Sequence, residues 1–229
     1  MSEPSLDFGR HPSDTTASAT AAEQVADVLR QRILSGQMAG GTPVRQEALA
    51  GEFGLSRLPV RDAIRILIAE RLLVARPRQG AAVAELTIHD LQELYDFRLA
   101  IEPALSRLAV SNLHRANVLM MEEQLKVTEG AKHVAAWIEA NDRFHWLLYS
   151  ESGRPWMIEM LDQARQRTGR YTRIKVAGLT SDPLNRQHRK ILDAVIQRDG
   201  EALEVAVREH LRAGYDWVLR RLLETQAPA

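Results

Sequence analysis

Apolar residues recur at helical spacing along most of the chain, but only after a polar N-terminal stretch. Residues 1–19 are rich in Ser, Thr, Asp and Pro, with little apolar surface to bury, which predicts a flexible tail. From Thr20 onward the sequence TAAE has the spacing of a capping box, and valine and leucine positions follow at intervals of three and four. This pattern predicts a first helix that ends at the glycines between residues 36 and 41.

The next stretch predicts two further helices and a β-hairpin. The expected elements are helices at about 46–53 and 56–70 and strands at about 73–76 and 81–84. Gly54 ends the shorter helix, Ser56 can cap the longer one, and Pro59 is tolerated in its first turn, where backbone N–H groups lack intrahelical partners. Two helices joined by a tight turn and followed by a hairpin form a winged helix-turn-helix, which we assign to residues 20–86.

From Thr87 the pattern is helical, with no convincing strand. TIHD at Thr87 can cap a long helix, in which Pro103 should cause a kink. The expected helices cover about 87–112, 116–129, 132–151, 155–177, 183–198 and 201–225. Six amphipathic helices favour an all-α bundle over residues 87–229. The predicted fold class is therefore mainly α, with an N-terminal winged helix-turn-helix that carries a small β-hairpin wing and a C-terminal six-helix bundle.

Composition narrows the class of protein. The 229 residues are 45% hydrophobic, enough for real cores, and Lys+Arg and Asp+Glu each number 30, so a nucleic-acid signal must be local. The absence of Cys excludes disulfides and thiolate metal ligands. Apolar runs of membrane-spanning length and a signal-peptide pattern are also lacking. We therefore expect a cytoplasmic protein with no membrane partner.

Basic residues gather in the third predicted helix and the hairpin. In LSRLPVRDAIR, the residues Arg57, Arg61 and Arg65 are four apart and share one helix face, opposite apolar positions that would pack in a core. Between residues 57 and 78 there are six Arg against Asp62 and Glu70. A guanidinium fork can bind guanine or a phosphate, so this helix is expected to enter the major groove of double-stranded DNA. The alternative is a solvated face whose arginines pair with Asp62.

Further DNA contacts are expected around this helix. Arg45 lies ahead of the second helix, the Ser56 hydroxyl stands at the start of the third, and Arg78 and Gly80 lie at the hairpin tip. Each good bidentate base contact contributes about 1–3 kcal/mol of discrimination, so one helix with a few contacts falls short of operator specificity. A homodimer is therefore expected.

The segment from Val25 to Val83 resembles the GntR family of bacterial transcription regulators. LSRLPVRDAI is close to the family's recognition-helix pattern, and PRQGAAV matches its wing. The resemblance implies that Arg57, Arg61 and Arg65 contact operator DNA and that the protein binds short palindromes as a dimer.

Three histidines fall on separate predicted helices of the C-terminal half. Asn141 and His145 are four residues apart and share a helix face, while His188 and His210 lie on two later helices. A lone His is more often a hydrogen-bonded or surface residue than a ligand. Three imidazoles with one oxygen donor would suit Zn²⁺ or Ni²⁺, but helical spacing does not show that they converge.

The same half resembles the FCD effector domain of the FadR-type GntR branch, and its six helices are more similar to the VanR-like subgroup. The similarity lies in DLQELYDFRLAIEPALSRLAV, ANDRFHWLLYSESG and HRKILDAVIQRDGEALEVAVREHL. Many FCD domains bind a divalent metal through an Asp or Asn four residues before a His and through two further His. The resemblance therefore implies the ligand set Asn141, His145, His188 and His210, in which Asn replaces the Asp of many relatives and should weaken the site.

The resemblance also implies an effector-binding residue. Arg98 matches an arginine of the family that could clamp a carboxylate bidentately. The alternative for Arg98 is an ion pair with Glu102, four residues further along the same helix.

The sequence thus favours a transcriptional regulator, expected to be a repressor and not an enzyme, that responds to a small organic acid bound near a divalent metal. Three alternatives differ in what the histidines do. The first is an acyl-ligand sensor without a functional metal, and the second is an architectural DNA binder with structural histidines. The third is a metal-dependent hydrolase, against which the absence of an HExxH motif counts.

Overall fold

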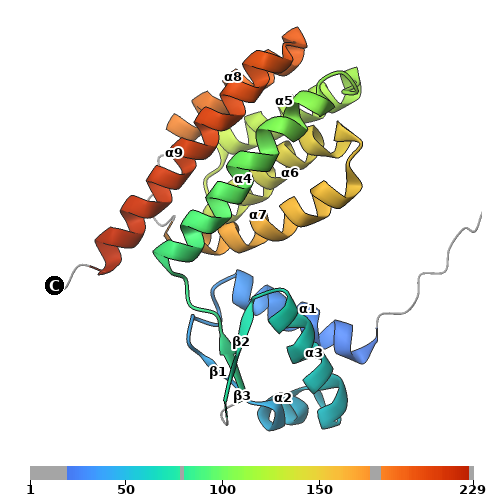
Figure 1. The fold of residues 1–229 in the computed structure, drawn as a ribbon, viewed down its shortest axis with the longest axis vertical. Helices are drawn as coiled ribbons and strands as arrows, with labels where there is room; N and C mark the ends of the chain where they lie inside the picture. Colours follow the sequence, from blue (N-terminus) through green and yellow to red (C-terminus); the bar gives the residue numbers. More distant parts are fainter. Residues whose placement is uncertain (1–19, 78–79, 176–181, 227–229) are drawn as a thin grey trace, which may run out of the picture.

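The computed structural model describes residues 20–77, 80–175 and 182–226, and its elements gather around two hydrophobic cores. The smaller core belongs to the N-terminal elements and the larger one to the helices that follow, which lie above them in Figure 1. The predicted fold class is confirmed. Arg78, expected at the wing tip, lies outside the described residues.

The N-terminal elements form a winged helix-turn-helix. They are α1 (Ala21–Leu34), β1 (Pro43–Val44), α2 (Gln46–Phe53), α3 (Arg57–Ala69), β2 (Leu73–Arg76) and β3 (Gly80–Val83). The capping box of α1 is present: Glu23 N donates to Thr20 Oγ1 at 3.2 Å, and Thr20 N donates to Glu23 Oε2 at 2.7 Å. Ser56 occupies the N-cap position of α3, but its side chain makes no capping hydrogen bond.

The wing is a three-stranded antiparallel sheet in the order β1-β3-β2. The hairpin of β2 and β3 was expected, and β1 was not, because two residues that begin with Pro43 give no strand pattern. Val44 pairs with Ala81, which places the segment before α2 against β3, the central strand of the sheet. The wing and the start of α2 are thereby held together.

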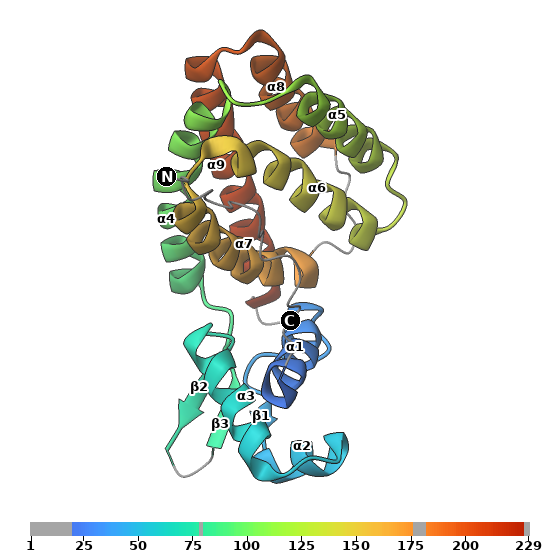
Figure 2. The same ribbon diagram turned by 90° about the vertical axis from the view of Figure 1, so that its right-hand side faces the viewer.

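Six α-helices make up the described part of the C-terminal half, as the sequence predicted. They are α4 (Ile88–Ala109), α5 (Arg115–Gly130), α6 (Val134–Tyr149), α7 (Pro155–Lys175), α8 (Asp182–Gln197) and α9 (Gly200–Gln226), with a 3-10 turn at Ser150–Ser152. The long helices α4 and α9 pack along one another, as Figures 1 and 2 show, and α5 packs against α6 and α8. Helix α4 continues through Pro103 to Ala109. None of the described helices is long and apolar enough to cross a membrane.

Helix α7 connects the bundle to the winged elements. Arg170 Nη2 donates to the carbonyl of Ala84 at 2.7 Å, and the Tyr171 hydroxyl donates to the carbonyl of Thr87 at 2.9 Å. Both carbonyls belong to the segment between β3 and α4. Because α1 also packs against α7, the two halves touch through side chains as well as through the connecting chain.

Candidate DNA interface and metal centre

One face of α3 is buried and the opposite face carries the arginines. Val60 and Leu67 are fully buried in the smaller core, whereas the side chains of Arg57, Arg61 and Arg65 are 72%, 51% and 70% exposed. Gly54 ends α2 in the left-handed conformation, with φ of +63°, which glycine adopts without steric cost. This turn leaves the basic face of α3 exposed.

Several of the expected DNA-contact residues line one groove. They are Arg45, Arg61, Arg65 and Gly80, and they are joined there by Arg76 of β2. Arg76 was not among the expected contact residues, although its position in the basic hairpin is a signal that could have found it. Arg57 does not line this groove itself, but it pairs at 2.7 Å with exposed Glu47, which does. The groove is therefore lined by arginines of α3 and β2 and by Arg45, which directly precedes α2.

Asp62 approaches two of these arginines without holding them tightly. It lies 3.7 Å from Arg61 and 3.7 Å from Arg65, and all three side chains are exposed. Ion pairs of this kind contribute about 0–1 kcal/mol and are screened by salt. The guanidinium groups can therefore exchange Asp62 for a phosphate or a guanine at little cost.

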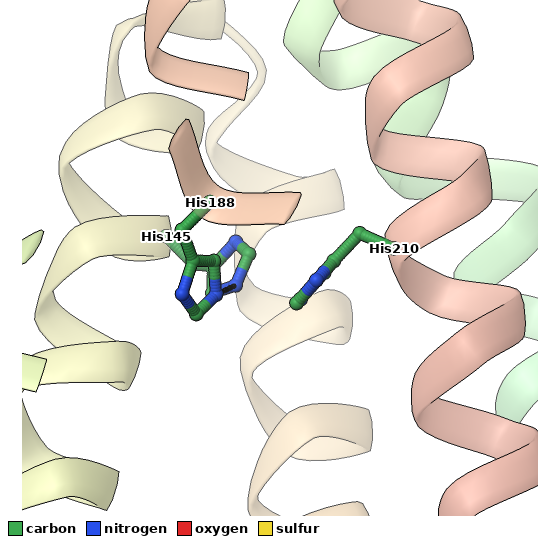
Figure 3. A group of neighbouring side chains, drawn as sticks. All are labelled: His145, His188 and His210. Carbon is green, nitrogen blue, oxygen red and sulfur yellow. Dashed lines mark hydrogen bonds between the residues drawn. The ribbon is translucent and has the colours of Figure 1, made fainter. Parts of the chain in front are cut away.

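The bundle brings three of the four expected metal ligands together. His145 of α6, His188 of α8 and His210 of α9 point toward one another in Figure 3. The Nε2 atoms of His145 and His188 are 3.3 Å apart, and one nitrogen from each ring lies within 4.8 Å of the others. All three side chains are buried. The convergence that helical spacing left open is present in the fold.

The hydrogen bonds of these rings leave nitrogen atoms for a ligand. His210 Nδ1 donates to Gln187 Oε1 at 3.2 Å, since a carbonyl oxygen only accepts, and this contact leaves a lone pair on Nε2 of a neutral ring. The Nδ1 atoms of His145 and His188 are buried and have no hydrogen-bond partner among the described residues. Histidines kept only for structure are expected to have such groups paired, so the described contacts do not close the cluster into a network. The Nε2 atoms of His145 and His188 hydrogen-bond to each other at 3.3 Å, and a metal ion between the rings would replace that contact.

The environment keeps the three imidazoles neutral. Burial lowers the pKa of each ring: that of His210 falls to about 3, and those of His145 and His188 lie well below 6.5. The positive charge of Arg165 on α7 lowers each of these pKa values further. Neutral imidazole is the form that binds metal.

One pair of the imidazole nitrogens has the spacing of two ligands on a tetrahedral zinc ion. Zinc–nitrogen bonds of about 2.0–2.1 Å in a tetrahedral site separate neighbouring nitrogens by about 3.3–3.4 Å. The separation of 3.3 Å between the Nε2 atoms of His145 and His188 matches this value. Asn141 lies one turn before His145 and is half-buried, and its Nδ2 donates to Asp142 Oδ1 at 3.3 Å. Its role as fourth ligand stays a prediction.

A buried carboxylate, Glu102, is connected to the histidines through Tyr149, whose ring stacks on that of His145 with 6.0 Å between the ring centres. Glu102 of α4 is fully buried and accepts from Arg98 Nε at 2.5 Å, from the Tyr149 hydroxyl at 2.7 Å and from Arg165 Nη1 at 3.4 Å. Burial opposes its ionisation, but Arg98 and Arg165 outweigh that effect and lower the pKa of Glu102. Arg98 thus forms the ion pair that was its alternative role, and its direct contact with an effector stays a prediction.

Two family models match the chain. The model of the bacterial regulatory proteins of the gntR family matches residues 21–83, and the FCD domain model matches residues 93–213. The chain belongs to the GntR family. Its members that carry an FCD domain are transcriptional regulators and not enzymes, so the hydrolase alternative is excluded.

The chain is similar to other GntR regulators over most of its length. The HTH-type transcriptional repressor RspR of Escherichia coli (strain K12) is 27% identical over 194 residues, which cover 83% of this chain and 85% of RspR. The "Probable D-xylose utilization operon transcriptional repressor" of Paenarthrobacter nicotinovorans is 30% identical over 200 residues, which cover 85% of this chain and 87% of that protein. The structure of E. coli McbR/YncC has a TM-score of 0.76 at 23% identity, covers 89% of this chain and 99% of its own, and shows the same fold.

We expect Arg61→Ala to weaken binding to operator DNA by about tenfold to a hundredfold, because a bidentate contact to a base or phosphate contributes about 1–3 kcal/mol. Fluorescence anisotropy with an operator selected from random sequence measures the change. Arg115→Ala, which removes an exposed arginine at the start of α5, is the charge-matched control and should bind normally. Equal affinities of the two variants would remove Arg61 from the interface.

The stability of metal-free protein should fall from pH 7 to pH 5. The unfolded chain binds protons at its histidines below about pH 6.5, whereas His145, His188 and His210 stay neutral in the fold, so acid favours unfolding. Each such histidine should lower the free energy of unfolding by about 1.4 kcal/mol for every pH unit below 6.5. Urea unfolding followed by tryptophan fluorescence tests this, because Trp137 lies 6.2 Å from His188 between ring centres.

The variant His188→Gln removes one of the three titrating groups. Its loss of stability between pH 7 and pH 5 should be smaller than that of the wild type by about 2 kcal/mol. His89→Gln, at an exposed position of α4, is the control and should behave like the wild type. An unchanged pH dependence in His188→Gln would contradict a neutral buried cluster.

Proposed function

We propose that this GntR regulator is a repressor that binds a palindromic operator as a homodimer and responds to a small carboxylate bound at a divalent metal in its helical domain. The observation that carries the proposal is the convergence of three buried, neutral histidines in the part of the chain that the FCD model matches. The names of two similar proteins, RspR and the D-xylose operon regulator, support repression as its mode of action. Acting on operator DNA, it works in the bacterial cytoplasm.

The DNA side of the proposal rests on the basic groove. Arg57, Arg61 and Arg65 stand on the exposed face of α3, which we propose enters the major groove as the recognition helix. Arg45, the Ser56 hydroxyl, Arg76, Arg78 and Gly80 would contact the flanking phosphates or the minor groove. The supporting observation is the shared lining of Arg45, Arg61, Arg65, Arg76 and Gly80.

The metal side of the proposal assigns His145, His188 and His210 as ligands and the amide oxygen of Asn141 as the fourth. Three imidazoles and an oxygen donor favour Zn²⁺ or Ni²⁺ over the hard cations Mg²⁺ and Ca²⁺. When bound, the ion supplies a Lewis acid with positions open to a carboxylate oxygen. The six helices support a place in the VanR-like subgroup.

Charge around the histidines favours a small acid over a long acyl chain. Arg98 and Arg165 outnumber the buried Glu102, and the positive charge that remains is balanced only by Asp142, whose side chain is 55% exposed. An acyl tail would need an apolar lining in that place, whereas a carboxylate would complete the charge balance. This observation ranks the acyl-sensor alternative below the organic-acid one.

The dimer proposal draws on the exposed apolar residues of α4. Phe97 and Leu108 are 37% and 39% exposed, and their spacing of three helical turns puts them on one face. Apolar residues in register on a long helix are typical of helix–helix contacts between copies. A second chain packed on α4 would bring two winged domains to one palindrome.

Zn²⁺ or Ni²⁺ at a hundred times its Kd should raise the melting temperature of EDTA-treated protein by about 5–11 °C, because such a ligand stabilises the fold by about 2.7 kcal/mol. A thermal-shift experiment on the metal-loaded protein then tests sugar acids, hydroxy acids, dicarboxylates and aromatic acids. At least one of these classes of acid should raise the melting temperature further and should also lower the affinity of the protein for operator DNA.

His188→Ala should lose both the metal shift and the acid shift, and His89→Ala, with an exposed histidine on α4, should keep both. A metal shift that survives in His188→Ala would exclude the buried cluster as the site. Stabilisation by long-chain acids in the presence of EDTA would instead support the acyl-sensor alternative.

A further inference from the structure

The two arginines beside Glu102 are held differently. Arg98 has its Nε 2.5 Å from Glu102, and its guanidinium carbon lies 5.0 Å from the ring centre of Tyr95. Arg165 makes two longer contacts, with Nη1 at 3.4 Å from Glu102 and Nη2 at 3.3 Å from Asp142. Short charge-assisted hydrogen bonds are the strong ones, so Arg98 is fixed while Arg165 is held loosely.

The partner that balances Arg165 is exposed to solvent. Glu102 already accepts from Arg98 and the Tyr149 hydroxyl at short distances, so the charge left on Arg165 falls to Asp142. The Arg165 side chain is 13% exposed, whereas the Asp142 side chain is 55% exposed. A pair of this kind forms and breaks at low cost, because water solvates the released carboxylate.

Arg165 faces a cavity as well as the buried site. A cavity of about 760 Å³, within the range of ligand pockets, is lined by Arg165, Asp142 and Tyr149 together with Trp146 and, from α1, Leu34. Arg165 reaches from this cavity to Glu102, and its charge acts on all three histidines. The residue therefore joins the cavity lining to Glu102, and Tyr149 of the same lining stacks on His145 with ring centres 6.0 Å apart.

We propose that Arg165, rather than Arg98, receives the effector carboxylate, and that Asp142 takes its place on the guanidinium when no effector is bound. An acid entering from the cavity displaces Asp142 from Arg165 Nη2 and forms a bidentate pair with the guanidinium. Arg98 acts as a positioning residue that holds Glu102. This inference rests on the proposed carboxylate response and names the residue that determines it.

Helix α7 connects Arg165, where the effector carboxylate replaces Asp142, to the DNA-binding domain. Arg165 lies less than two turns before Arg170 and Tyr171, whose side chains donate to the carbonyls of Ala84 and Thr87. A shift of α7 that follows the carboxylate therefore acts on the connection between the wing and α4. Leu34 in the cavity wall gives α1 a second contact with the same region.

A spectroscopic titration separates this inference from the proposed function. Co²⁺, bound in place of the native ion, gives visible absorption bands that report a carboxylate near the metal, and acetate is the probe. Arg165→Gln should bind Co²⁺ with an unchanged spectrum but raise the Kd for acetate by about tenfold or more, since a charge-assisted bidentate contact is lost. Arg165→Lys keeps the positive charge but loses the planar guanidinium, so its Kd for acetate should lie between those of the wild type and Arg165→Gln.

The Asp142 variant gives the opposite result. Asp142→Asn removes the competing carboxylate and should lower the Kd for acetate by about threefold, whereas Asp162→Asn, a second exposed acid of the same cavity, should leave it unchanged. Equal acetate affinity in the wild type and Arg165→Gln would overturn the assignment of Arg165. The proposed function itself would be contradicted if the wild-type protein failed to bind Co²⁺, or if acetate did not change the visible spectrum of the Co²⁺ protein.

Tyr171→Phe tests the route through α7. The variant keeps the ring and loses only the hydrogen bond to Thr87, so acetate binding to the Co²⁺ protein should not change. The ratio of operator affinities without and with acetate, measured by fluorescence anisotropy, should fall toward one. An unchanged ratio would exclude this contact as the link between the two halves.

Discussion

The buried carboxylate of Glu102 determines how the helical domain is arranged around its candidate site. An ionised carboxylate removed from water is costly unless it is paired and hydrogen-bonded, and Glu102 meets this condition with donors from three elements. Arg98 lies on the same helix, Tyr149 ends α6 and Arg165 comes from α7. Helices α4, α6 and α7 are thereby tied together at one point, beside the histidines.

The same charge arrangement explains why the histidines are suited to a ligand. Burial and the charge of Arg165 hold all three imidazoles in the neutral state, and Arg98 adds to this effect at His145 and His210, so their lone pairs are available near neutral pH. The net positive charge left after Glu102 is paired favours an anion next to them. Metal binding and carboxylate binding are therefore two consequences of a single electrostatic environment, and they meet at Arg165.

The winged domain depends on a simpler constraint. Its small core fixes one face of α3, and the arginines must then stand on the other face, toward the groove shared with the wing. Contacts from Arg170 and Tyr171 link the wing's outgoing segment to α7. A change in the bundle can thus reach the DNA-binding surface without a large rearrangement of either core.

Local patterns in the sequence were sufficient to predict the helices, the hairpin and the exposed arginines of α3, because periodicity and capping act over a few residues. Those signals were weak for β1, whose two residues become a strand only by pairing with β3. They also left open whether Arg98 binds an effector or Glu102, since both residues share one helix face. The structure answers this question, because Glu102 is fully buried and lies 2.5 Å from Arg98 Nε.

The sequence by itself determined the types of residue available: arginines four apart, histidines without cysteine, and six amphipathic helices. Only the tertiary structure decided which of them meet. His145, His188 and His210 come from helices far apart in the chain, and their convergence depends on how α6, α8 and α9 pack. Arg165 gave no signal because its importance lies in long-range contacts with Glu102 and Asp142, and such contacts exist only after the core has formed.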